Sequence, residues 1–102
     1  MKRSVLLGAL IVAASGLSGQ TLAADDKNIA YLAANCANCH GTDGKSVTPI
    51  MPKLAGHDSV FILESMRAYR SGEKSGTIMP QLSKGYTDEE YVLLAEYFSK
   101  IK

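Results

Sequence analysis

The sequence has little excess charge, few cysteines and no long hydrophobic run after its first 24 residues. Its 11 basic and 10 acidic side chains give a net charge of only +1 among 102 residues, which argues against a nucleic acid as partner. Only two cysteines are present, so a fold held by several disulfides is excluded. The later part of the chain shows no strand-like alternation and no internal repeat, and its size allows a single domain.

The N-terminal segment has the features of a secretory signal peptide. Lys2 and Arg3 precede a short apolar run, and small residues follow it. This order predicts a signal peptide over residues 1–24, cleaved after Ala23 or Ala24.

A membrane anchor is the alternative for this segment, but its apolar run is shorter than the about 20 residues that span a bilayer. We therefore expect no stable membrane anchor, and a periplasmic location. The mature domain, residues 25–102, then has 9 basic and 10 acidic side chains and a net charge of −1. A domain this short buries a small core, and a disulfide, metal or cofactor commonly completes such folds.

Two helices are predicted in the first half of the mature domain. The first runs from Asp25 to the histidine at position 40, with aspartates suited to its start. The second begins near Asp58, presents Ile62, Met66 and Tyr69 on one face, and ends at Gly72. On this second helix, three charged residues are expected to face water: Glu64, Arg67 and Arg70.

The last helix is the clearest of the three. Thr87 and Glu90 form a capping-box pattern, and apolar residues follow at helical spacing. Residues 41–56 and 71–85 are rich in glycine or polar residues and are predicted as two long loops. The fold class is therefore all-α, with three main helices, and loops of this length need a functional reason.

The residues Cys36-Ala37-Asn38-Cys39-His40 form the C-x-x-C-H motif for covalent attachment of a c-type haem. Two thiols one helical turn apart project from one face and can each form a thioether with a vinyl group. The histidine directly after them is then the proximal ligand of the iron. Attachment of this kind takes place outside the cytoplasm, which agrees with the signal peptide.

Three other interpretations of the cysteine pair are weaker. A thioredoxin-like redox pair needs a βαβ context that this chain lacks. A zinc site needs four ligands, and His57 is the only conventional candidate beyond Cys36, Cys39 and His40. A disulfide between residues this close would stabilise little and would leave the histidine unexplained.

The sixth ligand of the iron is one of four residues: Met51, His57, Met66 or Met79. Met66 lies on the apolar face of the second helix, where core packing explains it. Met51 and His57 are close to His40 in sequence, which leaves little chain to pass round the haem. Met79 is favoured because its loop is long enough and Pro80 stiffens the chain beside it.

An iron held by His40 and Met79 has no open coordination position, so the predicted chemistry is electron transfer and the chain is not an enzyme by itself. A histidine that ligates metal usually donates its other N–H to an acceptor. The carbonyl of Pro49 is the acceptor that we predict, because a proline there has no competing N–H and a fixed φ.

The chain resembles class I cytochromes c of the cytochrome c4/c553 group in two segments. These are residues 36–46, Cys-Ala-Asn-Cys-His-Gly-Thr-Asp-Gly-Lys-Ser, and residues 49–56, Pro-Ile-Met-Pro-Lys-Leu-Ala-Gly. The resemblance implies the class I cytochrome c fold around one covalent haem c, and it matches that group's proximal proline to Pro49.

Residues 69–79 and 84–90 are more particularly similar to the haem subunit of flavocytochrome c sulfide dehydrogenase. In that subunit, the methionine that matches Met79 is the distal ligand. His57 stands where group members often carry glutamine. The resemblance implies a sulfide-oxidising flavoprotein subunit as partner, together with other redox proteins. The alternative is a free soluble shuttle between respiratory complexes.

Overall fold

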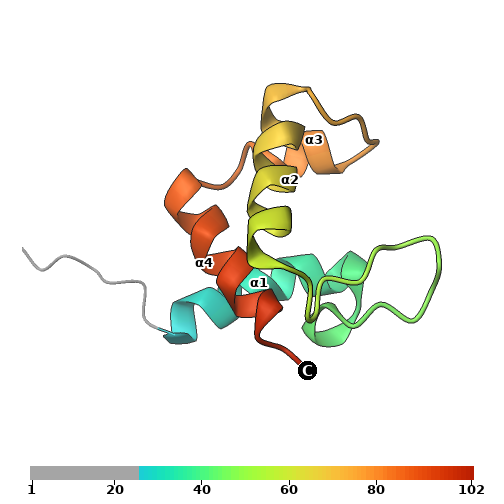
Figure 1. Ribbon diagram of the computed structural model, residues 1–102, viewed down its shortest axis with the longest axis vertical. Helices are drawn as coiled ribbons and strands as arrows, with labels where there is room; N and C mark the ends of the chain where they lie inside the picture. The colour runs from blue at the N-terminus through green and yellow to red at the C-terminus, as the bar shows by residue number, and fades with distance from the viewer. Residues whose placement is uncertain (1–25) are drawn as a thin grey trace, which may run out of the picture.

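The computed structural model describes residues 26–102, and the predicted signal peptide lies outside the described residues. The described chain is helical and contains no strand, as Figure 1 shows. Its elements are α1 (Asp26–His40), the 3-10 turn η1 (Thr42–Gly44), α2 (Ser59–Ser71), α3 (Met79–Ser83) and α4 (Asp88–Ser99). None of these helices has the length and apolarity needed to cross a membrane. The all-α prediction and its three long helices are therefore confirmed, whereas α3 was predicted as loop.

The ends of α2 and α4 are fixed by local hydrogen bonds. The Asp58 side chain accepts from the Phe61 N–H at 3.0 Å, and Gly72 ends α2 with φ of 85°. At α4, the Thr87 hydroxyl accepts from the Glu90 N–H at 3.1 Å, and the Glu90 carboxylate accepts from the Thr87 N–H at 3.4 Å. These ends lie where the sequence predicts them.

The core forms where α4 packs against both α1 and α2. Its buried members come from all three helices: Ile29, Ala33, Ile62, Leu94, Ala95 and Phe98. Two of these six are alanines, so the apolar volume supplied by side chains alone is small. In the view of Figure 1, the loop after α1 and the helix α3 extend to the right of α2, and most of α4 lies to its left.

The loop that follows α1 is irregular, but main-chain hydrogen bonds pin it. The Gly44 carbonyl accepts from the Leu54 N–H at 2.8 Å and from the Ala55 N–H at 3.1 Å. The next residue along the chain is Gly56, whose N–H donates to the Phe98 carbonyl at 2.9 Å. The end of the loop is thereby attached both to its own beginning and to α4.

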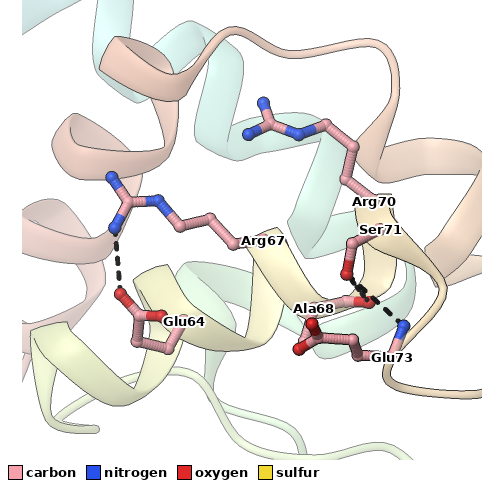
Figure 2. Close-up of a pocket in the computed structure, with 6 residues that line it drawn as sticks. All are labelled: Glu64, Arg67, Ala68, Arg70, Ser71 and Glu73. Atoms are coloured by element: carbon pink, nitrogen blue, oxygen red, sulfur yellow. Dashed lines mark hydrogen bonds and ion pairs between the residues drawn. The ribbon is translucent and has the colours of Figure 1, made fainter.

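The sequence predicts that Arg67 and Arg70 face water, but in the structure both arginines bind Asp88. Arg67 Nε and Nη2 donate to the two carboxylate oxygens of Asp88 at 3.0 and 2.5 Å, and Arg70 Nη2 donates to Asp88 at 3.1 Å. Arg67 also pairs with Glu64 at 2.9 Å, within the group drawn in Figure 2. The hydrogen bonds from Arg67 and then Arg70 lower the pKa of Asp88 to about 2. This cluster fastens α2 to the first residue of α4.

Candidate functional site

The two cysteines lie on the last turns of α1 and are not joined by a disulfide. Cys36 is half-buried and Cys39 is exposed. Because residues three positions apart in a helix share a face, both thiols are presented to the same side of α1. This is the arrangement that two thioethers to one macrocycle require.

The electrostatic environment of Cys36 does not suit disulfide exchange. Burial raises the pKa of its thiol, whereas reactive cysteines have a lowered pKa. The zinc interpretation also lacks support, because no group of three or more His, Cys, Asp or Glu side chains is placed to hold a metal among residues 26–102. Haem attachment is thus the interpretation that the site's own chemistry favours.

His40 is the last residue of α1 and is only 7% exposed. Its Nδ1 lies 2.7 Å from the carbonyl oxygen of Pro52. A carbonyl can only accept a hydrogen bond, so Nδ1 carries the proton and donates it. The lone pair therefore lies on Nε2, which is the atom left free to bind a metal.

The predicted acceptor for His40, the carbonyl of Pro49, is wrong. Both prolines are exposed, and the carbonyl within hydrogen-bond distance of His40 is that of Pro52. The reason lies in the pinned loop, because the bonds from the Leu54 and Ala55 N–H groups to Gly44 draw the chain directly after Pro52 against the end of α1. Two prolines three positions apart make the same local signal, and only these long-range bonds distinguish them.

The four possible distal ligands occupy different parts of the structure. Met79 is the first residue of α3 and is half-buried, while Met66 is half-buried within α2. Met51 directly precedes Pro52, in the segment that already contacts His40. The His57 ring is stacked on Phe61 with centroids 4.7 Å apart. Met79 is the one of these four that belongs to the segment after α2.

Exposed apolar side chains test whether this chain fits a haem. Several of the large apolar residues most open to water lie in the two segments that carry Pro52 and Met79: Val47 at 97%, Ile50 at 86%, Ile78 at 57% and Leu82 at 49% exposed. Exposed residues of this kind, beside a small core, leave apolar surface for a large flat apolar group to cover. The residues present therefore fit a haem.

A surface hollow on α2 is not part of this site. Figure 2 shows that it is lined by charged and small residues, among them Arg67 and Arg70, whose side chains extend along the outside of the helix. It contains none of the cysteines, histidines or methionines discussed above. Its arginines serve the ion-pair cluster with Asp88.

Comparison with known proteins decides the family. The family model for cytochrome c matches residues 18–102. The chain belongs to the cytochrome c family. A cytochrome c-554(548) from Halomonas halodenitrificans is 34% identical over 85 residues, which cover 80% of this cytochrome and 96% of that protein.

Two further relatives are longer than this cytochrome. The cytochrome subunit of sulfide dehydrogenase from Chlorobaculum tepidum is 39% identical over 70 residues, covering 69% of this chain and 63% of that protein. A cytochrome c4 from Pseudomonas aeruginosa is 35% identical over 88 residues, covering 85% of this chain and 44% of that protein. The chain thus spans less than two thirds of these two relatives.

These findings confirm the prediction of a class I c-type cytochrome with an all-α fold. Cytochromes c bind haem c covalently, and the residues from Cys36 to His40 fit the attachment motif. The cytochrome is therefore a haem-based electron carrier and not an enzyme by itself.

Proposed function

We propose that this cytochrome passes single electrons in the periplasm through a haem whose iron is held by His40 Nε2 and Met79 Sδ. The bound haem supplies the one-electron redox couple. Cys36 and Cys39 anchor it, and the bond from His40 Nδ1 to the Pro52 carbonyl carries the proposal, because it fixes the imidazole ring and leaves Nε2 as the ligating atom. Two protein ligands leave no position for a substrate, so only electrons are exchanged.

The ligand assignment is tested by changing each methionine in turn. Met79→His should abolish the methionine-to-iron charge-transfer band of the oxidised protein and lower the reduction potential, since a second imidazole favours ferric iron more than a thioether does. Met51→Leu and Met66→Leu are matched controls that should keep the band, because leucine and methionine are similar in volume. A band that survives Met79→His and disappears in a control would assign the ligand elsewhere.

We further propose that the electrons come from a sulfide-oxidising flavoprotein subunit. The similarity to the Chlorobaculum tepidum cytochrome subunit supports this partner. A free soluble shuttle is the second candidate, supported by the cytochrome c-554(548), which this chain matches over nearly the whole of that protein's length. The two differ in whether a flavoprotein accompanies the cytochrome.

Purification from the native periplasm separates the two candidates. For the subunit, the cytochrome should co-elute with flavin absorbance, and sulfide should reduce its haem far faster than it reduces the recombinant cytochrome alone. A cytochrome that elutes without flavin, and whose rate of reduction by sulfide equals that of the recombinant protein, would be a shuttle. The same preparation tests export, because cleavage of the proposed signal peptide leaves a chain that begins at Ala24 or Asp25.

A further inference from the structure

Tyr91 of α4 connects the last residue of α3 to the core. The Tyr91 side chain is fully buried, and its hydroxyl donates a hydrogen bond to the main-chain carbonyl of Ser83. Ser83 is itself fully buried, which is unusual for a serine at the end of a short helix. This hydrogen bond joins α4 to the end of α3.

The helix α3 is too short to be stable alone, since five residues form little more than one turn. It depends on bonds at its ends. The Ser83 hydroxyl donates to the Pro80 carbonyl at 3.0 Å, and the Ser83 carbonyl accepts from the Tyr86 N–H at 3.3 Å as well as from Tyr91. Pro80 fixes one backbone angle of the turn. The segment from Met79 to Ser83 therefore behaves as one stiff unit, which packs on α2 and is joined to α4 by the hydrogen bond from Tyr91.

Tyr91 is in turn held from α2. The guanidinium of Arg70 lies 4.9 Å from the centroid of the Tyr91 ring and donates to Asp88 at 3.1 Å. Asp88 begins the helix that carries Tyr91. One side chain thus joins α4, α3 and, through Arg70, α2.

We propose that Tyr91 is a positioning residue for the distal ligand, which its bond to the Ser83 carbonyl keeps on the iron. The inference rests on the proposed assignment of Met79, which lies at the opposite end of α3 from Ser83. If Met79 were to leave the iron by a movement of α3 as a unit, that movement would break the hydrogen bond from Tyr91 to the Ser83 carbonyl. The bond therefore favours the methionine-ligated state over any state in which another ligand has replaced Met79.

The test is a titration of the oxidised cytochrome with imidazole, which competes with Met79 for the iron. Tyr91→Phe removes the hydroxyl and keeps the buried ring. Imidazole should then displace the methionine at a concentration about fivefold lower, because about 1 kcal/mol is the net contribution of one hydrogen bond. The loss of the methionine-to-iron charge-transfer band reports the displacement, and a far-ultraviolet circular dichroism spectrum that stays native at every imidazole concentration excludes unfolding as its cause.

Ile29→Val is the matched control, since it removes one buried methylene from α1 and leaves α3 untouched. It should lower global stability without changing the midpoint of the imidazole titration. If Tyr91→Phe shifts that midpoint no more than Ile29→Val does, the inference is overturned and Met79 remains the ligand. If the wild-type cytochrome lacks the charge-transfer band, the assignment of Met79 itself fails, and the inference fails with it.

Discussion

Gly44→Ala should destabilise the cytochrome more strongly than an ordinary glycine substitution. Gly44 has φ of 71°, a left-handed conformation that costs an alanine about 1–2 kcal/mol. A Cβ at this position would lie 2.8 Å from the Phe98 ring and 2.9 Å from Leu54 Cβ. Overpacking of this kind costs about 1–3 kcal/mol more. The expected loss in free energy of unfolding is therefore about 2–5 kcal/mol.

Gly72→Ala supplies the control for this prediction. Gly72 has φ of 85°, and a Cβ there would meet no atom within 4 Å. It therefore pays the backbone cost of about 1–2 kcal/mol and no steric cost. Any effect of the added methyl group on the unfolded chain is common to both variants and cancels in their difference.

Urea unfolding of the haem-loaded protein measures both variants, with the slope of each transition checked against wild type. Gly44→Ala should be less stable than Gly72→Ala by about 1–3 kcal/mol. It should also perturb the haem spectrum, because movement of Leu54 displaces the nearby Pro52 carbonyl from His40. Equal stability of the two variants would show that Phe98 and Leu54 do not close on Gly44, and the account of the pinned loop would be wrong.

Two further predictions concern Asp88 and the cysteine pair. The pKa of Asp88 is lowered from 3.8 to about 2. Its pairing with Arg67 and Arg70 therefore stabilises the fold above about pH 4, and this stabilisation is lost as the pH falls toward 2. The urea midpoints of wild type and Asp88→Asn should therefore differ near neutral pH and converge in acid. Glu96→Gln changes an exposed carboxylate and is the control, whose midpoint should follow that of wild type at every pH. A difference between wild type and Asp88→Asn that stays constant with pH would contradict this prediction. Changing both Cys36 and Cys39 to alanine should abolish haem staining of the denatured chain, whereas His57→Gln should retain it, and staining of the double variant would refute covalent attachment through these residues.

The parts of the fold that the sequence predicts are those held by local interactions. The caps at Asp58, Thr87 and Glu90 join atoms three residues apart, and Gly72 ends a helix through its own backbone conformation. Such signals are complete within a few residues of sequence. The haem-attachment motif is of the same kind, because its geometry is set by one turn of helix.

The features that sequence analysis misses depend on distant partners. Helical periodicity places Arg67 on the outer face of α2, but its ion-pair partner, Asp88, belongs to another helix. The acceptor for His40 is Pro52 and not Pro49 because of bonds between Gly44 and residues 54–55. The helix α3 forms in a segment with weak propensity because it packs on α2 and because Tyr91 donates a hydrogen bond to its last residue. A proline in its first turn, Pro80, was the one local signal for it.

The same kind of contact supports both proposed ligands of the iron, His40 and Met79. On each side, a side chain carried by a long helix donates a hydrogen bond to a main-chain carbonyl of an irregular or short segment: His40 to Pro52, and Tyr91 to Ser83. A carbonyl acceptor exists whatever residue stands at its position, so these contacts constrain the path of the backbone more than the identity of the residue. Under the proposed ligation, the positions of His40 and Met79 consequently depend on α1 and α4, although the loops carry much of the site.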